Sequence, residues 1–297
     1  MPNLLPALRQ HWAALRLLLL LTVVLGIGYP LLITLLAQTP GLRSRADGSL
    51  VRLNGQVVGS AQLGQLFLDS SGDPLPQYFQ PRPSAAGDGY DPTASAASNL
   101  GPESIVDRLP DPAVQGDTGT PSLLTRVCAR SLAVGNQFGV SGARPYCTAD
   151  GVGAVLAVFW SGPGYAGHVT RAVSLNQPCP GRPFLASYQE ASVECARAGA
   201  DYAGGQVVPI RGSAPGRPAV PADAVTASGS GLDPDISPGY ARLQQAAVAR
   251  ARDISVAQVA ALVRRYTTGR DLGFMGEPRV NVLELNLALD RQYPTAR

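Results

Sequence analysis

The stretch from Thr226 to Asp233, Thr-Ala-Ser-Gly-Ser-Gly-Leu-Asp, contains the residues best suited to hold a ligand. Small residues let a backbone approach another molecule closely, and consecutive amides beside the hydroxyls of Ser228 and Ser230 can form a nest for an anion. The stretch does not follow G-x-G-x-x-G and contains no lysine, so as a nucleotide motif it is weak. A tight structural loop before the next helix is the alternative.

Three other features invite a catalytic interpretation that the rest of the sequence does not support. Asp117-Thr-Gly-Thr120 resembles the Asp-Lys-Thr-Gly-Thr of P-type pumps, yet the lysine and the nucleotide-binding motifs of such pumps are missing. His168 has no G-x-S-x-G serine elbow to serve. Asp233 and Asp235 precede a predicted helix start, where carboxylates are favourable without any catalysis. We therefore assign no catalytic residue.

The amino-acid composition excludes several further classes of catalytic and binding site. All the basic residues are arginine, 24 against 21 acidic residues, and the net charge of +3 gives no argument for a nucleic-acid partner. Without lysine there is neither a P-loop nor a Schiff base, and two histidines cannot build a multi-histidine metal site. We expect no metal and no cofactor bound by the chain alone. The 33 glycines and 26 prolines predict many turns and loops.

An apolar stretch from Leu17 to Ala37 carries no charge and spans roughly 31 Å as a helix, about the thickness of a bilayer core. It predicts a transmembrane helix over residues 17–38 after a cytoplasmic tail, residues 1–16. Pro30 predicts a kink, and Gly26 and Gly28 offer small surfaces for packing within the membrane. The alternative, a cleaved signal peptide, has a shorter apolar region and an A-x-A site, which is absent here.

Four cysteines follow the apolar stretch without any C-x-x-C spacing: Cys128, Cys147, Cys179 and Cys195. They predict two disulfides, of unspecified connectivity, and hence an oxidising compartment. Buried free thiols are the alternative. The flanking charges are nearly balanced, so the cysteines decide the orientation: a single-pass plasma-membrane protein with a cytoplasmic N-terminus and an extracytoplasmic domain.

Local signals predict the elements. Asn54-Gly55 predicts a hairpin over 49–59, and capping residues predict helices over 122–133, 237–252 and from 255. Apolar runs at 151–160 and 169–175 indicate neighbouring strands, and residues 69–120 are predicted to be loops. For 280–289 we expect a strand leading into a short helix, with Glu284 and Asn286 on a polar strand face opposite the leucines; a capped helix is the alternative.

The order of short motifs resembles the C subunit of the bacterial Kdp potassium-transporting ATPase. The matching stretches are Gly28–Leu32, Gly48–Leu50, Gly59–Phe67, Tyr78–Ala85, Tyr90–Pro92, Ser98–Pro102, Val220–Pro234, Ile236–Pro238, Val248–Arg252 and Leu272–Asp290.

This resemblance implies an accessory subunit of a high-affinity potassium uptake complex. The implied partners are a channel-like potassium-conducting A subunit, a P-type ATPase B subunit, a small F subunit and the lipid bilayer. The C subunit is implied to stabilise assembly and to act as a catalytic chaperone that raises the ATP affinity of the ATPase subunit. Ser228, Gly229, Ser230 and Gly231 would then be the nucleotide motif.

The sequence departs from the family pattern at residues 133–219, where a long insertion holds three of the four cysteines. We therefore expect an α+β fold: a transmembrane helix, a KdpC-like soluble domain formed by 39–132 and 220–297, and an inserted, mostly-β, disulfide-braced subdomain. A membrane-anchored envelope scaffold unrelated to transport, or an envelope enzyme using His168, Asp233 or Asp235, would be the rival functions.

Overall fold

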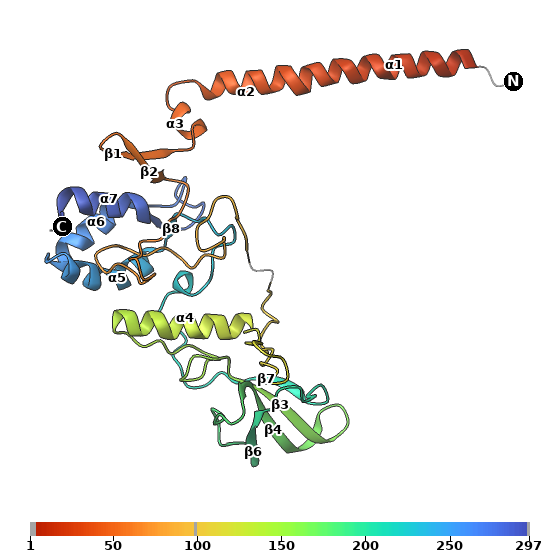
Figure 1. Cartoon of the computed structure of the whole chain (residues 1–297), viewed down its shortest axis with the longest axis vertical. Coiled ribbons are helices and arrows are strands. Elements are labelled where there is room, and N and C mark those ends of the chain that lie inside the picture. The colour runs from red at the N-terminus through yellow and green to blue at the C-terminus, as the bar shows by residue number, and fades with distance from the viewer. Residues whose placement is uncertain (1–3, 98–99, 296–297) are drawn as a thin grey trace. The chain divides into compact units, whose positions relative to one another are not determined.

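The computed structural model describes residues 4–97 and 100–295, which form two compact units of mixed helix and sheet content, Met1–Gln62 and Leu63–Arg297 (Figure 1). The first three residues of the predicted tail, and Ser98 and Asn99 of one motif, lie outside the described residues.

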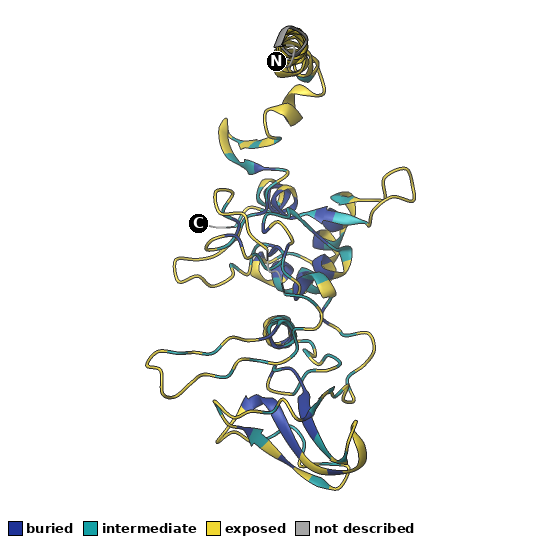
Figure 2. Ribbon diagram, turned by 90° about the vertical axis from the view of Figure 1, so that its right-hand side faces the viewer, coloured by how far each residue is buried: buried dark blue, intermediate teal, exposed yellow. Residues whose placement is uncertain are grey.

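The first unit begins with a long apolar helix. Helix α1, Leu4–Val23, passes through a π-helical turn, Val24–Gly28, into α2, Tyr29–Ala37. Within the described residues only Leu8–Ala37 is long and apolar enough to cross a membrane, which is consistent with an anchor, and none of its most apolar window is buried. Figure 2 views this helix nearly end-on, with its visible turns in the colour of exposed residues. Gly26 and Gly28 lie in the π turn and Pro30 in the first turn of α2. Proline lacks an amide hydrogen, so the helical ladder changes spacing just before it.

A short helix and a hairpin complete this unit. Helix α3, Arg43–Ala46, precedes strands β1, Leu50–Leu53, and β2, Gln56–Ser60, which pair antiparallel. Asn54 and Gly55 have φ values of 51° and 83°, as a type I′ turn requires, so the predicted hairpin is confirmed.

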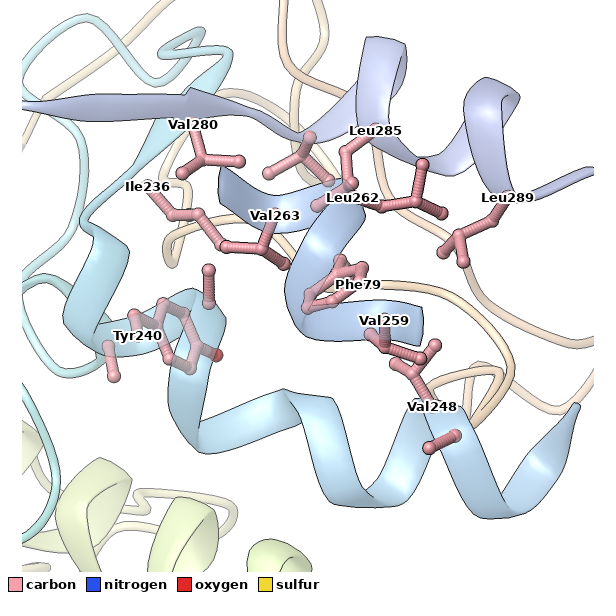
Figure 3. Close-up of a cluster of buried hydrophobic side chains, with 14 of the residues drawn as sticks. Phe79, Ile236, Tyr240, Val248, Val259, Leu262, Val263, Val280, Leu285 and Leu289 are labelled. Carbon is pink, nitrogen blue, oxygen red and sulfur yellow. The ribbon is translucent and has the colours of Figure 1, made fainter. Parts of the chain in front are cut away.

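Three helices and a small sheet surround the main core of the second unit. They are α5, Pro238–Ala251, α6, Val256–Arg265, and α7, Val282–Gln292, with strands β8, Asp235–Ile236, β10, Arg279–Asn281, and β9, Thr267–Thr268, in the order β8-β10-β9. The predicted cap at Ser237 and capping box at Ser255 are both present. Figure 3 shows the Phe79 ring beside α6, with Val248 of α5 and Leu285 and Leu289 of α7 around it.

Phe79 and Gln80 are buried among these helices, in a segment that forms no strand. The side-chain amide of Asn286 accepts from the Phe79 N–H (2.9 Å) and donates to its carbonyl (2.9 Å). Gln244 does the same for the N–H (2.7 Å) and carbonyl (3.1 Å) of Gln80. Two side chains thus provide the hydrogen bonds that a β ladder would otherwise give this buried backbone. We call these four hydrogen bonds the Phe79 clamp.

The expected order for residues 280–289, a strand leading into a helix, is confirmed, but the extent of the strand and the place of Asn286 need correction. The strand is only Arg279–Asn281, and Asn281 caps a helix that continues to Gln292. The leucines at 283, 285, 287 and 289 are all buried on this helix, and Asn286 is buried as well, 1% exposed, instead of lying on a polar strand face. Alternation failed as a guide because α7 packs on more than one side.

The predicted insertion contains a second sheet. Helix α4, Leu123–Phe138, precedes β3, Val155–Gly162, β4, Ala166–Pro178, β5, Ser187–Tyr188, β6, Ala191–Ala196, and β7, Gln206–Pro209, ordered β5-β6-β4-β3-β7. The predicted pairing of β3 with β4 is confirmed, and both faces of these strands are covered: Val155 and Val173 pack in one cluster, Leu156 and Ala172 in another. A 3₁₀ turn, Ala222–Ala224, then leads back to the main core.

Both expected disulfides are present, and their connectivity is now defined. Cys128 of α4 bonds to Cys147, and Cys179, which follows β4, bonds to Cys195 of β6. Each closes a short loop, with sequence separations of 19 and 16.

Replacing Gln244 by alanine should lower the free energy of unfolding by about 2 to 3 kcal/mol, because it leaves two buried backbone groups of Gln80 without partners. Denaturant unfolding of the full chain in detergent micelles measures this. Gln245→Ala, one position along α5 and only half-buried, is the matched control and should change stability by less than about 0.5 kcal/mol. Equal effects of the two variants would contradict the clamp.

Peptide mapping without reductant should recover Cys128 joined to Cys147 and Cys179 joined to Cys195, with neither crossed pair. The double variant Cys179→Ser/Cys195→Ser should unfold with about 3 kcal/mol less stability, since closing a loop of this length restricts the unfolded chain by that order. A crossed pair in the map would overturn the assigned connectivity.

Candidate functional site

The Ser-Gly-Ser-Gly motif forms a tight loop whose polar groups mostly bond to one another. Ser228 is 1% exposed, and its Oγ accepts from the amides of Gly231 (3.0 Å) and Asp233 (3.3 Å). The Ser230 Oγ accepts from the Leu232 amide at 3.1 Å. Gly229 and Ser230 are exposed and form the outward part of the loop. Three backbone amides that an anion nest would use are therefore already engaged.

The loop is fastened to an earlier segment of the chain, and we call residues 82–96 together with 226–233 the motif junction. The Ser228 amide donates to the Pro83 carbonyl (2.9 Å), and the Ser84 hydroxyl donates to the Gly231 carbonyl (2.6 Å). The Ser95 hydroxyl reaches the Ser230 carbonyl at 2.5 Å. Separate sequence motifs thus meet at one place.

A partly buried ion pair closes the junction. The Arg82 guanidinium lies 2.9 Å from the Asp233 carboxylate, and the two side chains are 25% and 36% exposed. Arg82 also donates to the carbonyls of Thr226 (3.4 Å) and Ala227 (3.3 Å). Asp233 therefore holds the loop in place, a more specific role than favouring a helix terminus.

Tyr90 and Gly64 contact the two segments that the ion pair joins. The Tyr90 hydroxyl donates to the Arg82 carbonyl at 2.8 Å, and burial, followed by the nearby Asp233 carboxylate, raises the pKa of Tyr90 well above its usual range. The Gly64 amide donates to the Leu232 carbonyl at 2.9 Å. A side chain at position 64 would collide with the Tyr90 ring, so the close approach requires glycine here.

Of the other residues singled out in the sequence, Asp117 and His168 lie outside the junction in sequence, and Asp235 lies just beyond its last residue. Asp117 forms a bidentate pair with Arg108 (2.7 Å for both bonds), and this guanidinium keeps the pKa of Asp117 far below its usual range. His168 lies exposed on β4. Asp235 faces Arg279 at 3.6 Å, and burial nevertheless raises the pKa of this carboxyl.

Several residues of the site were not anticipated from the sequence. Ser84 and Ser95 supply the hydroxyls that hold the loop, and Arg82 supplies its counter-charge. The start of α5 is held by Asp223, which accepts from the amide (2.7 Å) and hydroxyl (2.9 Å) of Ser237. A hint was available for Arg82, a charged residue between two prolines within a motif.

Comparison of the sequence with known proteins identifies its family. The family KdpC, described as K+-transporting ATPase, c chain, matches residues 11–108 and 194–291, which together include the whole motif junction. The chain belongs to the KdpC family. Its separately matched segments are the ones that the Arg82–Asp233 pair and the Phe79 clamp join.

Curated relatives cover nearly the whole chain. The potassium-transporting ATPase KdpC subunit of Kineococcus radiotolerans is 39% identical over 287 residues, covering 97% of this chain and 96% of the relative. The KdpC subunits of Rhodospirillum rubrum and Mycobacterium bovis are 35% and 34% identical, covering 97% and 95% of this chain and 99% and 98% of theirs. Residues 109–193, which the family comparison leaves unmatched, therefore have counterparts in these KdpC subunits.

The two glycines of the loop provide a matched pair of substitutions. Gly231 has φ +76°, and a Cβ there would lie 2.6 Å from the Ala86 Cβ, whereas a Cβ on Gly229 would meet nothing within 4 Å. Gly231→Ala should therefore cost about 1 to 3 kcal/mol of stability and Gly229→Ala less than about 0.5. Thermal unfolding of the two variants measures this, and equal costs would show that the loop is not held as described.

Proposed function

We propose that this member of the KdpC family is a non-catalytic accessory subunit of a Kdp-type potassium uptake complex, and that it acts by contacting the other subunits. The family membership is the observation that carries the proposal. The local chemistry supports it: Arg82, Ser84 and Ser228 of the motif junction bond to other groups of the junction, and His168 lies outside the junction, in the exposed first part of β4.

The proposed partners are the channel-like potassium-conducting A subunit, the P-type ATPase B subunit and the small F subunit. The helix Leu8–Ala37 would lie in the bilayer among their helices. Gly26 and Gly28 support this placement, because a residue without a side chain lets a neighbouring membrane helix pack closely. Pro30, in the next turn, would fix the local change of helical spacing at that contact.

We further propose that the second unit lies outside the cytoplasm, with the N-terminus inside. The two disulfides support this orientation, since such bonds persist in oxidising compartments. In this topology the Ser228–Gly231 loop and cytoplasmic ATP would be on opposite sides of the membrane.

The proposed chaperone effect, a raised ATP affinity of the ATPase subunit, is therefore an indirect one. The chain would stabilise the conformation of the ATPase subunit that binds ATP best, through coupling between separate sites. The hydrogen bonds already made by the amides of Ser228, Gly231 and Leu232 favour this route over direct contact of the motif with ATP.

Deleting the gene for this chain should abolish growth at limiting external potassium, and growth should return with added potassium. In the purified complex, removal of the chain should raise the KM for ATP by about fivefold or more, since allosteric couplings have that order. Gly229→Ala should leave this KM unchanged. Normal uptake without the chain would refute the transport role and favour a scaffold unrelated to transport.

A further inference from the structure

An unusually exposed apolar tip projects from the loop that joins β9 and β10. Leu272 is 83% exposed, Phe274 73% and Met275 51%. The first two exceed every large apolar side chain described in the long N-terminal helix, where Leu35 reaches 69%. Clustered apolar exposure of this degree marks a contact surface, because isolated exposure is common but a group of three large side chains is not.

The backbone of this tip is already ordered. Asp271 and Met275 exchange backbone hydrogen bonds of 2.9 Å in both directions, and the Gly273 amide donates to the Arg270 carbonyl at 3.2 Å. Leu272 and Gly273 both have left-handed φ values, 52° and 82°, which close the turn. A pre-organised tip loses little conformational freedom when it binds.

Charges at the base of the tip are paired within the hairpin. Arg270 lies 2.8 Å from Glu277, and Arg279 lies 3.5 Å from Asp271. The apolar tip can therefore enter an apolar site without bringing an unpaired charge with it.

A groove of 560 Å³ lies beside the hairpin, between its stem and helices α5 and α6. Thr267 and Gly269 line it from the stem, and Arg242 of α5 and Arg264 of α6 line it from the helices. Both arginines are exposed, and neither forms an ion pair within the described part of the chain. The groove thus offers two guanidinium groups to an acidic occupant.

We propose that this hairpin–groove surface, formed by Leu272, Phe274, Met275, Arg242 and Arg264, docks a partner subunit of the potassium-transporting complex. The partner presents an apolar pocket to the tip and a segment carrying carboxylates to the groove. This inference rests on the proposed function. A projecting tip beside a concave groove favours a protein over a membrane, because a flat lipid surface receives the tip but cannot fill the groove.

The test is co-purification of the full chain, tagged, with the other complex subunits. Leu272→Ser/Phe274→Ser should weaken capture at least about tenfold, the size expected for apolar residues at the centre of an interface. Tyr165→Ser, at an exposed aromatic position in the β3–β4 turn (51% exposed, the same value as Met275), is the control and should leave capture unchanged. Thermal unfolding of the variants confirms that folding is intact.

The groove is tested by charge. Arg242→Gln/Arg264→Gln should weaken capture and reduce its dependence on salt, because the two substitutions remove ionic interactions with the partner. Arg182→Gln, at an exposed arginine in the inserted segment, should change neither the capture nor its dependence on salt. Full capture by both the tip and groove variants would overturn the docking surface while leaving the transport role intact. Failure of the wild-type chain to capture any subunit would instead refute the proposed function.

A lipid occupant is distinguished with Phe274→Trp in the full chain. In nanodiscs without the other subunits, brominated acyl chains should not quench the additional tryptophan emission relative to the parent chain, and that emission should shift to the blue only when the complex assembles. Quenching in the nanodisc alone would assign the tip to the membrane and overturn the protein docking surface.

Discussion

Burying a backbone segment that forms neither helix nor strand is the constraint on which the second unit depends. Gln77–Gln80 has no adjacent strand, so its amide and carbonyl groups need other partners, and Asn286 and Gln244 provide them across sequence separations of 207 and 164. Arg252, whose side chain is 0% exposed, adds a bond from its Nε to the Gln77 carbonyl at 2.7 Å and an ion pair with Asp290 at 2.8 Å. Because the backbone of Phe79 and Gln80 and the Arg252 guanidinium are buried, removing one of their partners costs more than an ordinary hydrogen bond contributes. The Phe79 side chain then completes the core between the helices.

The same constraint explains how the family tolerates a long stretch between its two matched segments. The Phe79 clamp and the Arg82–Asp233 pair join residues 11–108 directly to residues 194–291. The chain between these segments is therefore not needed to hold them together. The five-stranded sheet begins in this stretch, and its strands β6 and β7 extend into the second matched segment. It has apolar clusters of its own, around Val155 on one face and Leu156 on the other, and both disulfides lie between residues 128 and 195. The main core therefore does not rely on that sheet for its apolar contacts. KdpC relatives that match nearly the whole chain show that a comparable stretch of sequence is present in other members of the family.

Features set by local chemistry could be predicted from the sequence. The Asn54-Gly55 turn, the Ser237 cap and the Ser255 capping box depend on residues a few positions apart, and all three are present. Asn286 was misplaced because its role depends on a backbone segment 207 positions earlier, and alternation with leucine carries no trace of that partner. The connectivity of the cysteines was open for the same reason. Within the candidate site, the sequence indicated the loop at Ser228 but not the hydroxyls of Ser84 and Ser95 that hold it.

The structure separates what holds this unit together from what it offers outward. In the motif junction the polar groups face one another: the Ser228 hydroxyl accepts from two amides of its own loop, and Arg82 from one segment meets Asp233 from the other. In the β9–β10 hairpin the arrangement is reversed, since the backbone and charges are satisfied internally while Leu272 and Phe274 point into solvent. A residue whose donors and acceptors are already bonded inside the fold has few of them free for a ligand. An apolar side chain exposed on an ordered turn, in contrast, is stabilised when another surface covers it and removes it from water. The hydrogen bonds of the Ser228–Gly231 loop therefore support a structural role for it, and the exposed side chains of the hairpin support the docking role that we propose for that surface.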